Sequence, residues 1–208
     1  MCGYTAAVST LCDAPHGGNY VRYLAHDCEP VIFPALILCG GRGTRSGSPI
    51  NKCFIDAACK PFILHQLEWL ESQGITTVTL GRGEEGTLTA IRKAAPQLGD
   101  RFLVFYGDTL TRLDLRDLID EWLVSTCPMV TAFYDDVDAG VSGVCRWALN
   151  RVGERVTDFG VLRDFFDDAG RLLRYVSPVK WLEVGTPEAL AHARRELGVR
   201  FDNDPWQR

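Results

Sequence analysis

A glycine-rich stretch at residues 38–52 has the residue types that hold phosphate groups, and it ends in a lysine. Glycine adopts backbone conformations closed to other residues, and without a side chain it lets backbone N–H groups approach phosphate oxygens. Arg45 and Lys52 would add positive charge. No Gly-Lys-Thr or Gly-Lys-Ser follows the glycines, so the stretch is not a P-loop. It predicts a cradle for a nucleoside triphosphate, with an ordinary strand-to-helix turn as the alternative.

A carboxylate, Asp108, directly follows the apolar run 102–106. The glycine-rich stretch also follows an apolar run, at 35–38, and the carboxyl ends of parallel strands share one edge of a sheet. Asp108 is therefore expected to face the same crevice as the glycines. A magnesium ion that bridges phosphates takes oxygen ligands of this kind. The alternative is an aspartate that only shapes a turn or caps a helix.

The order Gly-Gly-x-Gly-Thr-Arg, then Lys52, then Lys60-Pro61 at a helix start resembles the sugar-1-phosphate nucleotidylyltransferase family. The family signature continues with Pro-Lys, and here Asn51 replaces the proline. The resemblance implies that Arg45 and Lys52 are catalytic. The nucleotide contacts that it implies in this stretch are Cys39, Gly40, Gly41, Gly43 and Thr44.

Two further segments extend the resemblance. Gly107-Asp108 matches the family's magnesium-binding Gly-Asp, and residues 181–188 resemble its Trp-x-Asp-x-Gly-Thr-Pro-Glu motif with Glu183 in place of the aspartate. The resemblance implies that Asp108 and Glu183 hold Mg²⁺ together. Two carboxylates that converge without a cation would repel each other, which supports a shared ion. A solvated carboxylate at the sheet edge is the alternative for Glu183.

Residues 85–91 resemble the family segment that touches base and ribose, although Leu88 and Thr89 stand where two glycines are expected. The resemblance implies nucleotide contacts by Gly86 and Thr87. A simple helix start at these positions explains the same residues equally well.

The acceptor side departs most from the family. Residues 160–176 resemble its Tyr-Gly-Val hairpin and are expected to form an antiparallel hairpin. The Glu-Lys-Pro and Asn-Ala-Gly segments that should follow are missing, and that block normally holds the sugar phosphate. Arg163 and Lys180 are the residues that could bind the acceptor instead.

The leading functional hypothesis is a Mg²⁺-dependent nucleotidylyltransferase that joins a nucleotide to a phosphorylated small-molecule acceptor, a sugar 1-phosphate first among them, and releases pyrophosphate. Two alternatives stay open. One is a short cytidylyl- or guanylyltransferase of the methylerythritol phosphate or molybdenum cofactor type, because Lys52 follows Arg45 by seven residues. The other is a nucleotide-binding regulatory domain that has lost catalysis.

The elements that would position these residues alternate between strand and helix from residue 31 onward. Pro61 opens a predicted helix that ends near Gly74, and Asp114 caps another. The alternation predicts an α/β fold, a three-layer Rossmann-like, mixed and mostly parallel sheet flanked by helices, with a small antiparallel hairpin. Residues 1–30 read as an N-terminal extension of unknown role, and residues 31–208 as the nucleotidyltransferase domain.

Composition limits the partners and the compartment. A formal net charge of −5 and a pI near 5.4 argue against a nucleic-acid or anionic-membrane partner. No run of 18 apolar residues and no signal peptide is present. Eight cysteines without a Cys-x-x-Cys pair favour a reduced, cytoplasmic protein. A homo-oligomer is compatible with these observations, and the composition does not decide it.

Overall fold

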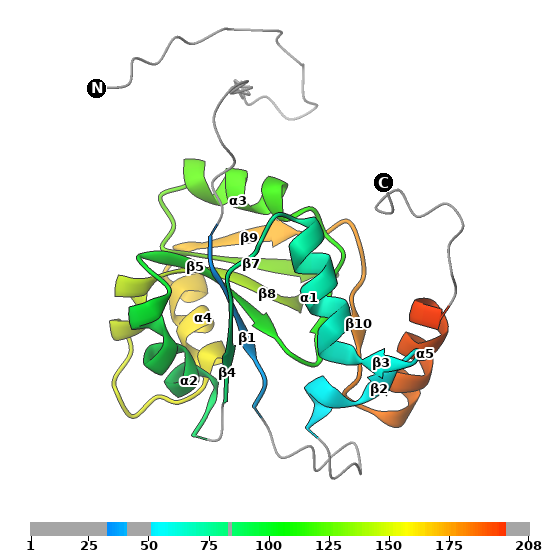
Figure 1. The fold of residues 1–208 in the computed structure, drawn as a ribbon. Helices are drawn as coiled ribbons and strands as arrows, with labels where there is room; N and C mark the ends of the chain where they lie inside the picture. Colours follow the sequence, from blue (N-terminus) through cyan, green and yellow to red (C-terminus); the bar gives the residue numbers. More distant parts are fainter. Residues whose placement is uncertain (1–32, 41–50, 83–84, 199–208) are drawn as a thin grey trace, which may run out of the picture. The chain divides into compact units, whose positions relative to one another are not determined.

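The computed structural model describes residues 33–40, 51–82 and 85–198. Their main element is a six-stranded sheet in the order β4-β1-β5-β8-β7-β9 (Figure 1). Its strands are β1 (Ala35–Leu38), β4 (Val78–Gly81), β5 (Arg101–Tyr106), β7 (Met129–Tyr134), β8 (Val137–Cys145) and β9 (Leu172–Val176). Only β8 runs against its neighbours, which it joins in antiparallel pairs, while the other three pairings are parallel. The predicted mixed, mostly parallel sheet is confirmed.

Helices cover both faces of this sheet. These helices are α1 (Phe62–Ser72), α2 (Thr87–Ala94), α3 (Leu115–Val124) and α4 (Phe159–Asp168). A fifth helix, α5 (Pro187–Gly198), packs against short strands outside this sheet, and the short 3-10 helices are η1 (Lys52–Phe54), η2 (Ala95–Gln97) and η3 (Arg146–Asn150). Figure 1 shows α1 and α3 on one face and α2 and α4 on the other. The three-layer arrangement expected from the alternating pattern is therefore present.

Local signals explain where several helices begin. The Asp114 carboxylate accepts a hydrogen bond from the Arg116 N–H at 2.9 Å and so caps α3, as predicted. Pro61 precedes the first residue of α1, and Gly74 follows the helix with a positive φ of 80°. That conformation is easy for glycine and ends the helix.

The predicted hairpin at residues 160–176 is wrong. Asp158 caps α4 by accepting from the Gly160 N–H at 2.8 Å, and the chain then enters β9, which lies parallel to β7. The apolar side chains Phe159, Leu162 and Phe166 recur at spacings of three and four and are all buried, which is a helical period. Small antiparallel pairs do exist elsewhere: β2 (Asp56–Ala57) with β3 (Lys60–Pro61), and β6 (Thr109–Leu110) with β10 (Leu182–Glu183).

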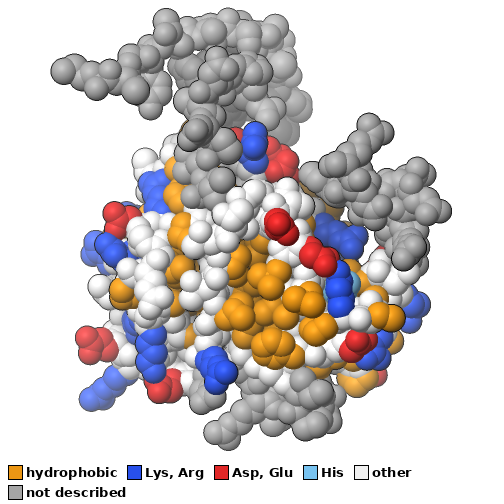
Figure 2. Space-filling model, in the orientation of Figure 1, with side chains coloured by type: hydrophobic (Ala, Val, Ile, Leu, Met, Phe, Trp, Pro, Cys, Tyr) orange, Lys and Arg blue, Asp and Glu red, His pale blue; other side chains and the backbone are white. Residues whose placement is uncertain are grey.

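The core fills the space between sheet and helices, with Leu36, Phe102 and Trp122 fully buried. A smaller cluster joins α5 to the short strands through Ala57, Leu110 and other buried residues. Figure 2 shows apolar side chains gathered near the centre of the face seen in Figure 1. Among the described residues, no helix is long and apolar enough to cross a membrane.

Candidate active site

The glycine-rich stretch and Asp108 follow two strands that lie side by side. β1 and β5 are parallel, and Leu38 at the end of β1 pairs with Tyr106 at the end of β5. The backbone N–H of Gly107 donates to the Leu38 carbonyl at 3.1 Å, so the two strand ends stay joined beyond the ladder. Both candidate segments therefore begin at one point on the carboxyl edge of the sheet, where open α/β sheets bind ligands.

Of the stretch at 38–52, the structure describes residues 38–40, 51 and 52, which include Cys39, Gly40 and Lys52. The other predicted residues, Gly41, Gly43, Thr44 and Arg45, lie outside the described residues. Cys39 is buried and Gly40 is exposed. The chain thus leaves the core of the sheet at the first glycine.

Lys52 and Asp108 form an ion pair at this edge. Lys52 Nζ lies 3.3 Å from Asp108 Oδ2, and the two side chains are 23% and 36% exposed. A methyl group added at Gly185 would lie 3.6 Å from Lys52 Nζ, so the third motif also reaches this lysine. Residues far apart in the sequence, from three separate motifs, meet around one ammonium group.

Glu183 lies on the strand next to Asp108. It pairs with Thr109 in the β6–β10 ladder, and the Val184 N–H donates to the Asp108 carbonyl at 3.0 Å. Within residues 33–40, 51–82 and 85–198, no group of three or more His, Cys, Asp or Glu side chains could hold a metal ion. Binding of one Mg²⁺ by Asp108 and Glu183 together stays a prediction, and in the ladder Glu183 lies opposite Thr109, the residue after Asp108.

Gln66, which the sequence did not single out, fixes the turn that carries Asp108. Its carboxamide is 2% exposed, and Nε2 donates to the carbonyl oxygens of Tyr106, at 2.8 Å, and of Thr109. One buried side chain of α1 therefore holds both ends of the turn. No motif marks such a residue, because a glutamine on an apolar helix face has no local signature.

Asn51, which stands where the resembling family has a proline, joins the two ends of the glycine-rich stretch. Its Nδ2 donates to the Cys39 carbonyl at 2.6 Å, and its Oδ1 accepts from the Cys53 N–H at 3.1 Å. A single carboxamide thus links the residue before the glycines to the residue after Lys52. It also caps η1, which contains Lys52.

A tight contact leaves no room for a side chain at position 107. A methyl group at Gly107 would lie 2.4 Å from Cys53 Sγ and 2.8 Å from the Leu38 carbonyl oxygen. The glycine of the Gly-Asp pair is thereby required by packing against the end of the loop. This contact joins the position of Asp108 to the position of Cys53 and Lys52.

Solved structures with a similar fold are known, although no protein-family model and no curated protein matches the chain. HddC from Yersinia pseudotuberculosis, complexed with GMP-PN, superimposes with a TM-score of 0.69 at 20% identity, over 80% of this chain and 100% of that one. A second structure of HddC gives 0.68. A putative glucose-1-phosphate thymidylyltransferase from Bacillus anthracis, in complex with a sucrose, gives 0.69 at 16% identity, over 83% and 98%. The chain shares their fold.

This shared fold agrees with the family that the sequence motifs resemble.

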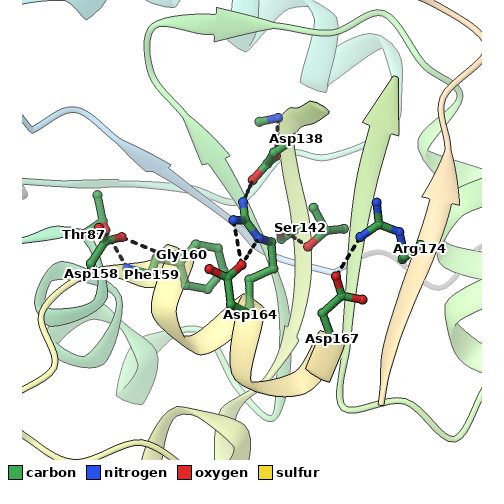
Figure 3. Close-up of polar contacts among 12 residues, drawn as sticks. Thr87, Asp138, Ser142, Asp158, Phe159, Gly160, Asp164, Asp167 and Arg174 are labelled. Carbon is green, nitrogen blue, oxygen red and sulfur yellow. Dashed lines mark hydrogen bonds and ion pairs between the residues drawn. The ribbon is translucent and has the colours of Figure 1, made fainter. Parts of the chain in front are cut away.

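Gly86 and Thr87, the predicted nucleotide contacts, both lie against other residues of the fold. Gly86 has φ of +107°, and a side chain there would clash with Thr157. The Thr87 hydroxyl accepts from the Phe159 N–H at 2.9 Å (Figure 3). The Leu88 N–H donates to the Thr157 carbonyl at 2.8 Å. The starts of α2 and α4 cap each other, and contact of these two residues with a nucleotide stays a prediction.

Arg163 is engaged by two acidic side chains. Its guanidinium lies 2.7 Å from Asp138 and 2.8 Å from Asp164 (Figure 3). Burial by itself would lower the pKa of Arg163, but the hydrogen bonds to Asp164 and Asp138 raise it above its ordinary value. The positive charge of Arg163, which was predicted to bind an acceptor phosphate, is therefore already balanced by two carboxylates.

Lys180, the other predicted acceptor residue, lines a pocket of about 370 Å³. The pocket also contains Glu183, Trp181, Tyr134 and His192. The Tyr134 and Trp181 rings meet edge to face with centroids 6.2 Å apart. Lys180 and Glu183 thus line one concave surface at the carboxyl end of β7. Lys180 is therefore a better candidate than Arg163 for contact with the acceptor.

Proposed function

We propose that this chain is a nucleotidylyltransferase that joins a nucleotide from a nucleoside triphosphate to a phosphorylated acceptor, a sugar 1-phosphate first among them, with release of pyrophosphate. The observation that carries the proposal is the Lys52–Asp108 ion pair. It joins the end of a glycine-rich stretch to a Gly-Asp turn on the neighbouring parallel strand. The fold shared with HddC and the putative thymidylyltransferase supports it.

The chemistry needs positioning and charge balance rather than a covalent intermediate. An oxygen of the acceptor phosphate attacks the α-phosphorus in line, and pyrophosphate leaves. In this proposal Arg45 and the glycine amides hold the β- and γ-phosphates. Lys52 contacts the α-phosphate and the incoming oxygen, where negative charge gathers in the transition state. On binding, Lys52 exchanges part of its contact with Asp108 for these oxygens.

Asp108 and Glu183 are the residues that would hold Mg²⁺. Their adjacent backbones and hard oxygen donors suit the ion. A bound Mg²⁺ would offset the charge of the phosphates. Gln66 then serves as a positioning residue, because it fixes the turn on which Asp108 stands.

The acceptor in this proposal occupies the pocket beside Glu183. Lys180 would meet its phosphate, while Trp181 and Tyr134 supply flat apolar surface of the kind that packs against a sugar ring. Its volume of about 370 Å³ lies within the range of small-molecule sites.

The test is pyrophosphate release from each of the four ribonucleoside triphosphates and dTTP with Mg²⁺ and a panel of sugar 1-phosphates. Methylerythritol phosphate is included as the acceptor of the short transferases. Turnover with a sugar 1-phosphate supports the proposal. Triphosphate binding by calorimetry without turnover of any acceptor favours the regulatory alternative, and the absence of triphosphate binding contradicts both.

A further inference from the structure

One arginine of α2 binds a whole segment of the chain beside it. Arg92 is partly buried, and its guanidinium donates six hydrogen bonds to backbone carbonyl groups within residues 149–156. The two shortest run to the Val156 carbonyl at 2.8 Å and to the Leu149 carbonyl at 2.9 Å. The other acceptors are the carbonyl groups of Val152, Gly153 and Glu154. All three guanidinium nitrogens, which present five N–H groups in a fixed plane, are used on this segment.

The segment has little other structure to hold its shape. Residues 151–158 connect η3 to α4 and contain no helix or strand. A turn bond from the Val156 N–H to the Gly153 carbonyl at 2.9 Å spans only part of them. Among the described residues, Arg92 supplies every side-chain hydrogen bond that the carbonyl groups of 149–156 accept. Because irregular backbone must find partners for its polar groups elsewhere, Arg92 sets the path of this segment.

The segment ends against the turn that is predicted to contact the nucleotide. The next residue, Thr157, has a carbonyl that accepts from the Leu88 N–H at 2.8 Å. A methyl group added at Gly86 would lie 2.5 Å from that carbonyl oxygen and 2.7 Å from Thr157 Cβ, so the two backbones touch. The Phe159 N–H then donates to the Thr87 hydroxyl at 2.9 Å (Figure 3). The positions of Gly86 and Thr87 thus depend on where the chain places Thr157.

We propose that Arg92 is a positioning residue for the nucleotide: by fixing residues 149–156 and Thr157, it holds the turn at Gly86 and Thr87 in the shape that receives base and ribose. Arg92 stands in the last turn of α2, whereas Gly86 and Thr87 stand at its start. It therefore acts through the segment and not by contact with substrate. Its effect on the turn stands on the hydrogen bonds alone. Its effect on binding rests on the proposed function, because it assumes that this turn contacts a nucleotide.

The effect on binding is confined to one part of the ligand. In the proposed site, the phosphates belong to the glycine-rich stretch and Lys52, which follow β1. Base and ribose belong to Gly86 and Thr87, at the start of α2. Loss of Arg92 therefore weakens the binding of a nucleoside triphosphate. It leaves the binding of inorganic tripolyphosphate unchanged, because that anion has neither base nor ribose.

Residue-resolved hydrogen exchange tests the effect on the turn. Arg92→Met keeps an unbranched apolar side chain and removes all the donors. We expect the amides of Leu88 and Phe159 to exchange at least tenfold faster than in wild type, while the amides of β5 keep their rates. Gln73→Leu is the matched control, because Gln73 accepts from the Leu115 N–H on the other face of the sheet and should leave both amides unchanged. Wild-type exchange at Leu88 and Phe159 in Arg92→Met overturns the positioning role.

Calorimetry in the presence of Mg²⁺ tests the effect on binding. In Arg92→Met we expect the Kd of a non-hydrolysable nucleoside triphosphate to rise at least tenfold and the Kd of inorganic tripolyphosphate to change less than twofold. Arg92→Lys keeps the charge but places three donors on one nitrogen, which cannot reach the same set of carbonyl groups. It should give a smaller rise, and it replaces Arg92→Met in both experiments if that variant does not fold. Gln73→Leu should bind both ligands as wild type does.

The remaining outcomes separate this proposal from the proposed function. An unchanged nucleoside triphosphate Kd in Arg92→Met, or an equal rise for both ligands, overturns the effect on binding and leaves the proposed function intact. A wild type that binds no nucleoside triphosphate contradicts the proposed function together with that effect, and hydrogen exchange then judges the turn alone. If wild type binds the nucleotide but no tripolyphosphate, the nucleotide Kd of Arg92→Met relative to that of Gln73→Leu decides.

Discussion

Lys52 and Asp108 belong to separate motifs and form a partly exposed ion pair. An ion pair of this exposure contributes little to the stability of the fold, about 0.2–1 kcal/mol. The surrounding structure nevertheless fixes both partners, through Asn51 on one side and Gln66 on the other. Two positioned charges with little effect on stability are what the proposed role in substrate binding requires.

Lys52→Ala is therefore expected to lower the rate of pyrophosphate release at least 100-fold while changing the free energy of unfolding by less than about 1 kcal/mol. Lys60→Ala is the matched control, because Lys60 pairs with Glu68 and has a similar exposure. Chemical denaturation and a release assay are run on both variants. Equal rates in the two variants would remove Lys52 from the mechanism.

A substitution of Gln66 tests whether this side chain positions Asp108. Gln66→Leu leaves two buried carbonyl groups without their donor, so we expect a loss of about 1–3 kcal/mol in unfolding free energy and slower turnover. Gln73→Leu is the control, since Gln73 Oε1 accepts from the Leu115 N–H at the start of α3, away from Asp108. Both variants should lose stability, and only Gln66→Leu should raise the Mg²⁺ concentration needed for half-maximal activity. An unchanged Mg²⁺ requirement would make Gln66 purely structural.

Among the elements, α2 and α4 depend on each other at their first turns. Thr87 accepts from the Phe159 N–H, and Thr157 accepts from the Leu88 N–H. Each helix thus satisfies a terminal N–H group of the other, which an isolated helix start leaves unpaired. The arrangement joins the region of Gly86 to the segment that replaces the predicted hairpin.

Thr87→Val keeps the shape of the side chain and removes the acceptor. We expect a loss of about 1 kcal/mol in unfolding free energy, within the usual range for a lost helix cap. Thr87→Ser retains the hydroxyl and should stay close to wild type. Denaturation of the three proteins checks the structural role, and calorimetry with a triphosphate in the same samples reports whether Thr87 also contacts nucleotide.

The features of the helices and strands that the sequence predicts correctly depend on hydrophobic periodicity or on residues close in sequence. The strands at the apolar runs 35–38 and 102–106, the cap at Asp114 and the helix after Pro61 depend on neighbouring residues, and all are confirmed. The hairpin predicted for residues 160–176 is wrong, because the resemblance to a family hairpin was given more weight than the helical spacing of the apolar residues in this segment. Gln66 and the Asn51 link could not be predicted, because each depends on partners that only the folded chain brings near.

At the scale of the whole molecule, the two residues predicted to bind the acceptor, Lys180 and Arg163, have different surroundings. Lys180 lines the pocket beside Glu183, whereas Arg163 is neutralised by Asp138 and Asp164. Lys180→Ala is expected to raise the acceptor KM at least tenfold and to leave the triphosphate Kd unchanged. Arg163→Ala should instead lower the melting temperature, with less effect on the acceptor KM. The reverse pattern would move the acceptor to Arg163.

The proposed function also carries an expectation about selectivity for the acceptor, because the segment that holds the sugar phosphate in the resembling family is absent after residue 176. The charged or polar side chains that line the pocket are Lys180, Glu183, Asp135 and His192, beside the aromatic rings of Tyr134 and Trp181. With Lys180 and Glu183 assigned to the phosphate and to Mg²⁺, few partners are left for the sugar hydroxyl groups, and aromatic surface distinguishes poorly between epimers. Each absent buried hydrogen bond removes on the order of 1 kcal/mol of discrimination, or about fivefold. We therefore expect kcat/KM values for glucose, galactose and mannose 1-phosphates to lie within about tenfold of one another. Their measurement with a single triphosphate is the test, and a preference above 100-fold for one sugar would mean that further residues contact its hydroxyl groups.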